Sequence, residues 1–282
     1  MSCEGCPNQG SCGKDQSSCQ IENNPNNHIK KIVAVMSGKG GVGKSTITVM
    51  LAKSLAKKGL KVGIMDADIT GPSIPRLFAT EHEQAYATKE NFIIPIETAD
   101  HIKIMSLNFM MKNESDPVIW RGPIIAGVVK QFYTDVIWGD LDVLLIDMPP
   151  GTGDVALTIM QSLPVSGVVM VSTPQPMVSM IVSKAIHMCH QMSIAVYGVI
   201  ENMAYLECPN CQEKIDFYEK SDLDSFIREN ETKIYCTLPM LDLIRDINQY
   251  AEYNDNQKEI IESLISDTAC SLCDDLHLEC HK

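Results

Sequence analysis

Short apolar runs alternate with longer amphipathic stretches along most of this chain. The apolar runs are rich in β-branched residues, as is typical of strands buried on both faces, and they cover residues 31–37, 60–66, 141–147, 165–173 and 194–202. The stretches between them show helical spacing and cover residues 45–59, 124–138, 154–163 and 177–192. Strands of this kind in alternation with helices predict an α/β fold, with a mostly parallel, twisted sheet and helices on both faces.

The pattern divides the chain into one large domain and two cysteine-bearing ends. Residues 1–28 are polar and too poor in apolar side chains to pack alone, so we expect a flexible segment. Residues 29–250 carry the alternating pattern, interrupted at 71–122 by an insert in which NFIIPIE and HIKIMSL predict short irregular strands. After Asn202 we expect a cysteine-bearing loop, a polar helix and the strand KIYCTLP, and residues 251–282 form a C-terminal helix and tail.

The composition of the chain indicates which binding partners and which cellular compartment to expect. The 282 residues, 45% of them hydrophobic, suffice for a large core, and the formal net charge of −13 disfavours nucleic acid or an anionic membrane as partner. The first residues lack the apolar core of a signal peptide, and no run reaches the roughly 18 apolar residues of a membrane span. We therefore expect a cytoplasmic protein, in which the 11 cysteines are metal ligands or buried packing residues and not disulfides.

The stretch SGKGGVGKST, residues 37–46, contains a complete phosphate-binding loop between a predicted strand and a predicted helix. In the pattern G-x-x-x-x-G-K-[ST], backbone N–H groups cradle a polyphosphate, Lys44 reaches the β- and γ-phosphates, and Ser45 can bind Mg²⁺. The nucleotide-binding residues are therefore expected to be Gly38, Gly40, Gly41, Val42, Gly43, Lys44, Ser45 and Thr46. Lys39 is one lysine more than this pattern needs.

Three aspartates follow predicted buried strands and are candidates for magnesium binding and catalysis. Asp147 ends the run LDVLLID, where a buried carboxylate is costly unless it faces a cation, so it suits a Mg²⁺ ligand beside Ser45. Asp66 and Asp68 end another strand two residues apart, hence on the same side, and one of them could orient the attacking water. A solvated aspartate in a turn is the alternative for each of the latter two.

The motif CPNC supplies half of a metal site. Cys208 and Cys211 provide two thiolates, whereas a tetrahedral zinc ion or a four-iron cluster needs four ligands, so a partner must supply the rest. If two chains meet about a two-fold axis, two such loops complete the set. A zinc site and a redox-active cysteine pair are the alternatives.

The other cysteines lie near the two ends or in apolar runs. The cysteines of the N-terminal segment could bind an iron–sulfur cluster, bind zinc or bind no ligand, and they are Cys3, Cys6, Cys12 and Cys19. The C-terminal stretch could bind metal or could simply end a helix, and it carries Cys270, Cys273, His277, Cys280 and His281. Cys189 and Cys236 lie in apolar runs and are expected to be core thiols.

Five motifs together resemble the Mrp/ApbC family of P-loop ATPases, which are iron–sulfur cluster carriers or scaffolds related to the MinD, ParA and nitrogenase-iron-protein group. The motifs are SGKGGVGKST, DADITGPSIP, WRGP, LLIDMPPGTGD and ENMAYLECPNC, within about residues 29–250. The resemblance implies an ATPase that uses Mg²⁺ and works as a homodimer. It also implies a [4Fe–4S] cluster held by Cys208 and Cys211 of two protomers, received from cluster donors and passed to apo-proteins.

The same resemblance implies roles for single residues. Lys39 would cross the two-fold interface to the nucleotide of the partner, Asp68 would be the switch carboxylate that positions water, and Pro149–Asp154 would be the second switch. Asn202 resembles the residue whose amide reads adenine, although an asparagine that closes a strand is more often a turn former. The N-terminal motif resembles that of the eukaryotic cytosolic branch, with Cys19 as the nearby candidate for a fourth ligand.

Two other functions compete with this interpretation. One is a zinc-handling P-loop NTPase of similar architecture. The other is a MinD- or ParA-like positioning ATPase, which would need a basic amphipathic tail or a basic DNA-binding face, whereas the C-terminal stretch IIESLISDTACSLCDDLHLECHK is acidic.

Overall fold

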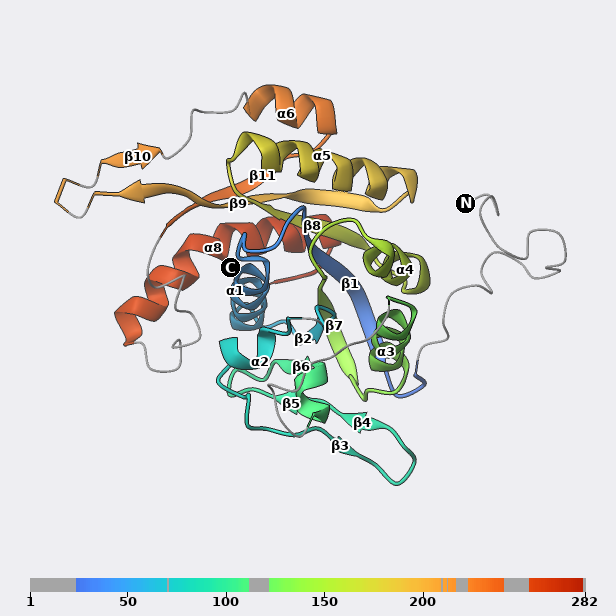
Figure 1. The fold of residues 1–282 in the computed structure, drawn as a ribbon. Coiled ribbons are helices and arrows are strands. Elements are labelled where there is room, and N and C mark those ends of the chain that lie inside the picture. Colours follow the sequence, from blue (N-terminus) through green and yellow to red (C-terminus); the bar gives the residue numbers. More distant parts are fainter. Residues whose placement is uncertain are drawn as a thin grey trace, which may run out of the picture.

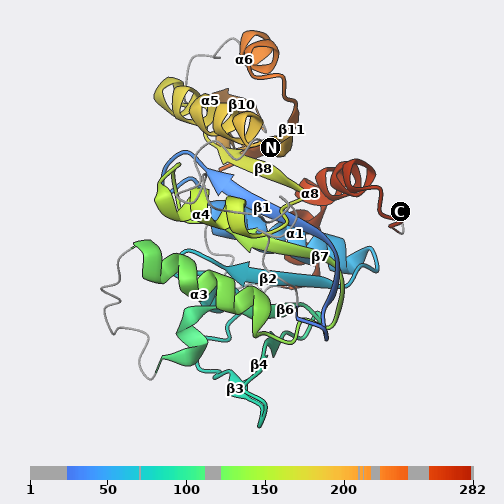
Figure 2. The same cartoon turned by 90° about the vertical axis from the view of Figure 1, so that its right-hand side faces the viewer.

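A nine-stranded sheet with helices on both faces forms the centre of the molecule (Figure 1, Figure 2). The computed structural model describes residues 24–69, 71–111, 122–208, 210–211, 213–216, 223–240 and 254–280. Across the sheet the strands follow the order β10-β9-β8-β1-β7-β2-β6-β5, and β11 pairs with β9. The predicted α/β fold with a mostly parallel sheet is therefore confirmed.

Most strands of the sheet run parallel. The parallel strands are β1 (His28–Ser37), β2 (Val62–Asp66), β6 (Lys103–Met105), β7 (Asp140–Asp147), β8 (Gly167–Ser172), β9 (Ala195–Glu207) and β11 (Ile234–Pro239). β5 (Ile96–Glu97) and β10 (Lys214–Asp216) are antiparallel to their neighbours, and β3 (Tyr86–Ala87) and β4 (Ile93–Ile94) form a separate ribbon. Because parallel strands end at one edge, the loops that follow them gather there.

Alternate residues of the central strands point to opposite layers of helices. In β1, Val33 and Val35 belong to the core beneath α1 (Lys44–Lys57) and α8 (Asp255–Leu276). The intervening residues, such as Ala34, belong to the core on the other face, beneath α3 (Gly122–Thr134), α4 (Asp154–Ser162) and α5 (Pro176–Gln191). Shorter helices are α2 (Ile74–Leu77), α6 (Leu223–Asn230) and the 3₁₀ helix η2 (Leu107–Met110). Burial on both faces explains why the strands read as continuous apolar runs.

β9 is longer than the sequence predicts. The apolar run suggests a strand that closes at Asn202 and a loop after it, but β9 continues to Glu207. The additional residues are paired on both sides, since Tyr205 lies opposite Asp216 of β10 and opposite Pro239 of β11. Asn202 therefore lies inside a strand, and Cys208 and Cys211 lie in the connection between β9 and β10 instead of in a loop that starts at Asn202.

Both ends of the described chain pack against this domain. Asn27 lies within the segment expected to be flexible. Its Nδ2 donates a hydrogen bond to Val136 O at 2.8 Å, and its Oδ1 accepts one from Gly139 N at 3.0 Å. At the other end Asn254 forms a capping box with Gln257, and α8 then packs on α1. Among the described helices, none is long and apolar enough to cross a membrane. Predicted features that lie outside the described residues are Cys3, Cys6, Cys12, Cys19, Trp120, Arg121 and His281.

The packing of α8 on the core gives a test of the fold. Ile265 is fully buried in the core beneath α1 and α8, so Ile265→Ala should lower the free energy of unfolding by about 3 kcal/mol. Ile260 on the same helix is 38% exposed, and Ile260→Ala should cost less than about 1 kcal/mol. Urea unfolding followed by circular dichroism measures both. Equal losses for the two variants would contradict the assignment of α8 to the core.

Candidate functional site

A glycine-rich loop joins β1 to α1 and shapes a hollow at the C-terminal edge of the sheet. Gly41 and Gly43 have φ angles of 78° and 83°, a left-handed conformation that favours glycine. Gly43 also has a close neighbour, because a Cβ there would lie 2.4 Å from Asn202 Nδ2. The hollow measures about 370 Å³ and is lined by Ser37, Gly40, Gly41, Gly43, Lys44, Ser45, Thr46, Asp68, Gly71, Ser73, Leu77 and Pro150. The N-terminus of α1 opens onto it, which suits a polyanion.

Asp147 is fully buried at the end of β7, and the first turns of α1 surround its carboxylate. Its Oδ2 accepts from Ser45 Oγ at 2.6 Å and lies 2.8 Å from Lys44 Nζ, while Oδ1 accepts from Thr48 Oγ1 at 2.9 Å. An ammonium and two hydroxyls thus offset the cost of burying this charge. The structure brings together Lys44, Ser45 and Asp147, as the sequence predicts. Thr48 is missed there, although it lies one helical turn beyond Lys44 and Ser45 and so on their side of the helix.

Asp66 and Asp68 do not share one side of a strand. β2 ends at Asp66, which is buried, pairs in register with Asp147 and accepts from Ser106 Oγ at 3.0 Å. Burial, together with the nearby Asp147, raises the pKa of Asp66 above its usual range. Asp68 lies beyond the strand and lines the hollow, with Oδ2 3.9 Å from Lys44 Nζ. The chain leaves the sheet between the two aspartates, so only Asp68 faces the hollow.

Lys39 contacts a residue of its own chain. Its Nζ donates to Gln175 Oε1 at 2.6 Å, and Gln175 directly precedes α5. The segment expected to be the second switch also touches the loop, because Gly151 N donates to Ser37 O at 2.8 Å. Gln175 is a site residue that the sequence analysis misses, and no local pattern marks it.

Asn202 reaches the phosphate-binding loop from the middle of β9. It is buried, and its Nδ2 donates to Val42 O at 3.0 Å. Its Oδ1 is buried and has no hydrogen-bond partner within the described residues. Since buried side-chain oxygens are normally hydrogen-bonded, this acceptor is available to a donor from a ligand. Asn202 is therefore part of the loop's surroundings and not a turn former.

Cys208 and Cys211 lie together at the turn of the β9–β10 hairpin. Cys208 N donates to Glu213 O at 3.0 Å, which closes the turn. Cys208 is half-buried and Cys211 is exposed. Hydrogen bonds from the backbone N–H groups of Cys211 and Asn210, and from the Cys211 side chain, lower the pKa of the Cys208 thiol. The hairpin therefore presents two thiols to solvent, and hydrogen bonds stabilise the thiolate form of Cys208.

Most of the other described cysteines lie in or against the hydrophobic core. Cys189 is buried in the core beneath α5, and Cys236 packs against the core on the opposite face of the sheet. Within the described residues no three side chains of His, Cys, Asp or Glu are arranged to hold a metal ion. A complete metal centre therefore does not form from these residues alone.

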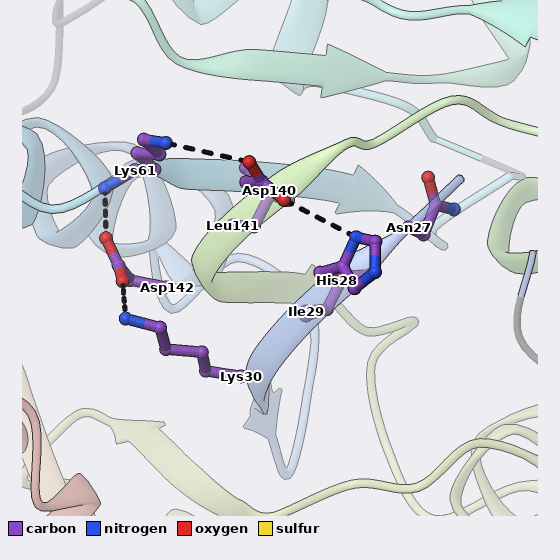
Figure 3. Close-up of a pocket in the computed structure, with 8 residues that line it drawn as sticks. All are labelled: Asn27, His28, Ile29, Lys30, Lys61, Asp140, Leu141 and Asp142. Carbon is purple, nitrogen blue, oxygen red and sulfur yellow. Dashed lines mark hydrogen bonds and ion pairs between the residues drawn. The ribbon is translucent and has the colours of Figure 1, made fainter. Parts of the chain in front are cut away.

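A second hollow, of about 600 Å³, lies where β1 and β7 begin, away from the phosphate-binding loop (Figure 3). Its charges face one another, with Lys30 Nζ 2.7 Å from Asp142 Oδ1 and His28 Nδ1 3.4 Å from Asp140 Oδ1. Partial burial acts to raise the pKa of Asp142, but hydrogen bonds from the Lys30 ammonium and the Lys61 backbone lower it overall. Because these charges largely neutralise one another, we assign the hollow no ligand.

Comparison with known proteins agrees with the geometry of the loop. Residues 28–273 match the family described as ParA, NUBPL iron-transfer P-loop NTPase. The chain belongs to this family. The chain is 46% identical over 253 residues to the iron–sulfur cluster carrier protein of Clostridium perfringens, and the match covers 85% of this chain and 87% of the relative. It is 40% identical over 217 residues to the cytosolic Fe–S cluster assembly factor CFD1 of Yarrowia lipolytica, covering 75% of each.

Solved structures share the fold of this chain. A nucleotide-binding protein of Archaeoglobus fulgidus in complex with ADP superposes with a TM-score of 0.70 at 42% identity, covering 83% of this chain and 92% of that one. MinD of Aquifex aeolicus gives a TM-score of 0.60 at 19% identity, and the match covers 86% of this chain and 97% of MinD. At this identity the likeness shows the fold alone. The resemblance found in the sequence motifs is thereby confirmed.

The contact between Gly43 and Asn202 can be tested by stability measurements. Gly43→Ala combines left-handed strain with a clash against Asn202, so it should lower the free energy of unfolding by about 3 kcal/mol. In an Asn202→Ala background the same change should cost only about 1–2 kcal/mol. Gly40→Ala, without positive φ and with its Cβ 4.0 Å from Pro150 Cγ, is the control and should be nearly neutral. The same cost in both backgrounds would rule out the contact.

Proposed function

We propose that this protein is an ATP-hydrolysing carrier of iron–sulfur clusters that works as a homodimer. Two relatives that match most of the chain are named an iron–sulfur cluster carrier protein and a cytosolic Fe–S cluster assembly factor. The observation that carries the proposal is the accessible thiol pair of Cys208 and Cys211, on a hairpin that extends the strand whose Asn202 contacts the nucleotide loop. Thiolates are the protein ligands that iron–sulfur clusters take.

The loop and its neighbours fit ATP with Mg²⁺. Lys44 and the loop N–H groups would hold the phosphates, while Ser45 and Asp147 would hold Mg²⁺, which neutralises charge on the phosphates. An adenine amino group would satisfy the buried Oδ1 of Asn202. The other members of the proposed nucleotide site are Gly38, Gly40, Gly41, Val42, Gly43 and Thr46.

We propose that hydrolysis needs two protomers. Asp68 lines the same hollow as Lys44 and is the candidate that orients the attacking water, while Asp66 lies behind it in the sheet. Lys39 would leave Gln175 and reach the phosphates of the partner's nucleotide. A polyphosphate can compete with the neutral amide of Gln175, because it adds the attraction between opposite charges to the hydrogen bond with the Lys39 ammonium.

The cluster site also calls for two protomers. Each chain offers two hairpin thiols, so a two-fold pair supplies the four thiolates of a [4Fe–4S] cluster. The lowered pKa of Cys208 favours the thiolate that binds iron. We propose that donors load this shared cluster in the cytoplasm and that the dimer passes it to apo-proteins. Cys3, Cys6, Cys12 and Cys19 stay candidates for a second cluster.

Substitutions of Lys44 and Lys39 should affect nucleotide binding and hydrolysis differently. Lys44→Ala should weaken ATP binding by about 100-fold or more, because the phosphates lose their nearest cation. Lys39→Ala should leave binding to a single protomer intact but slow hydrolysis by about 1,000-fold or more, as loss of a charge supplied in trans does. Calorimetry and phosphate release measure the two effects, with Lys57→Ala, on the exposed side of α1, as the control. Unchanged turnover in Lys39→Ala would refute the in-trans role.

The hairpin thiols should control iron content. Cys208→Ser and Cys211→Ser should each lose the shared cluster and its transfer to an apo-acceptor, because two variant protomers supply only two of the four thiolates, while ATP binding persists. Iron, sulfide and oligomeric state are measured in samples prepared without oxygen. Cys270→Ser, at the far end of α8, is the control and should keep the cluster. A monomer that retains a full cluster would contradict the shared site.

A further inference from the structure

Thr48 is a fully buried polar residue on the side of α1 that contacts the end of β7. Its Oγ1 lies 2.9 Å from Asp147 Oδ1 and 3.0 Å from Lys44 O, the carbonyl one helical turn before it. The hydroxyl has one proton, and the carboxylate is the stronger acceptor because it carries a charge. Thr48 therefore holds one oxygen of a side chain that is itself fully buried.

The two oxygens of Asp147 have different partners. Oδ2 lies next to Ser45 Oγ and Lys44 Nζ, and both of these residues line the hollow. In the proposed nucleotide complex Ser45 binds Mg²⁺ and Lys44 reaches the phosphates, so neither stays with Oδ2 alone. Thr48 is not among the residues that line the hollow. Of these three donors, it is the one that keeps its contact with the carboxylate when the nucleotide binds.

Packing alone does not require the hydroxyl of Thr48. A threonine inside a helix often donates to the carbonyl four residues earlier, and this is the structural alternative for Thr48. Valine differs from threonine mainly in carrying a methyl group in place of the hydroxyl, so it would fill the same space. It would, however, leave Asp147 Oδ1 without this donor, which is costly for a buried charge.

We propose that Thr48 is a positioning residue, which fixes the carboxylate of Asp147 so that the site binds Mg²⁺ together with the nucleotide. This role rests on the proposed function, in which Ser45 and Asp147 hold the metal ion. Groups that hydrogen-bond to a metal ligand orient it in advance, and their removal lowers metal affinity by about 10- to 100-fold. Thr48 thus controls how strongly Mg²⁺ is bound without touching the ion or the phosphates itself.

The test compares the full-length wild type with Thr48→Val and Thr48→Ser. Calorimetry measures the affinity for ADP in EDTA and in Mg²⁺, and phosphate release gives the Mg²⁺ concentration for half-maximal ATP hydrolysis. In Thr48→Val the gain in ADP affinity that Mg²⁺ provides should fall by about tenfold, and the half-maximal Mg²⁺ concentration should rise by about tenfold. The affinity for ADP in EDTA should stay within about twofold, because the contact acts on the metal ligand. Thr48→Ser keeps the hydroxyl and should resemble the wild type.

A matched control separates the metal site from the loss of any helical hydroxyl. Thr134 Oγ1, at the end of α3, also lies between the carbonyl four residues earlier and an aspartate, with Lys130 O at 3.2 Å and Asp135 Oδ1 at 2.7 Å. Thr134 does not line the hollow, so Thr134→Val should leave the response to Mg²⁺ unchanged. Urea unfolding checks that each variant is folded, and Thr48→Ala replaces Thr48→Val if the latter does not fold.

Two results would overturn this role of Thr48. One is a folded Thr48→Val whose response to Mg²⁺ matches that of the wild type. The other is a Thr48→Ser that loses as much as Thr48→Val, since the hydroxyl would then not be the cause. A wild type that binds ADP equally well with and without Mg²⁺ would instead remove the proposed metal site, and this role with it. The calorimetry needs neither a cluster nor hydrolysis, so it does not depend on the carrier function.

Discussion

The buried carboxylate of Asp147 is the constraint on which the nucleotide loop depends. A charge at the end of a central strand is stable only if cations and donors surround it, and these come from Lys44, Ser45 and Thr48. All three belong to the first turns of α1, so the helix must begin directly above the end of β7. The glycines of the loop make that short connection possible, because two of them adopt left-handed backbone conformations.

The parts of the site that follow from local sequence are those within or beside single elements. The loop, Lys44 and Ser45 can be recognised in the sequence, because the spacing of the motif reflects how such loops bind phosphate and Mg²⁺. Asp147 can be recognised because it ends a buried apolar run. Continuous apolar runs gave the correct α/β fold for the same reason, since strands covered on both faces need no alternation. Thr48 is recoverable as well, because helical spacing places it beside Ser45.

The parts that escape the sequence depend on contacts between distant segments. Ser106 and Gln175 reach Asp66 and Lys39 across 40 and 136 positions, and neither carries a pattern of its own. The true length of β9 depends on β10, a strand of three exposed residues that has no apolar signature.

The length of β9 has a mechanical consequence. From Asn202, held against the loop, six residues lead to Cys208, which at the rise of a strand is a distance of about 20 Å. A strand of this length would enlarge at the cysteines any change of its direction at the nucleotide loop. A tilt of about 5° at Asn202 would displace the cysteines by about 2 Å, close to the length of a metal–sulfur bond of about 2.3 Å. In the proposed homodimer, two such strands facing each other would double that displacement, so a small rotation at the nucleotide would suffice to open the proposed shared site.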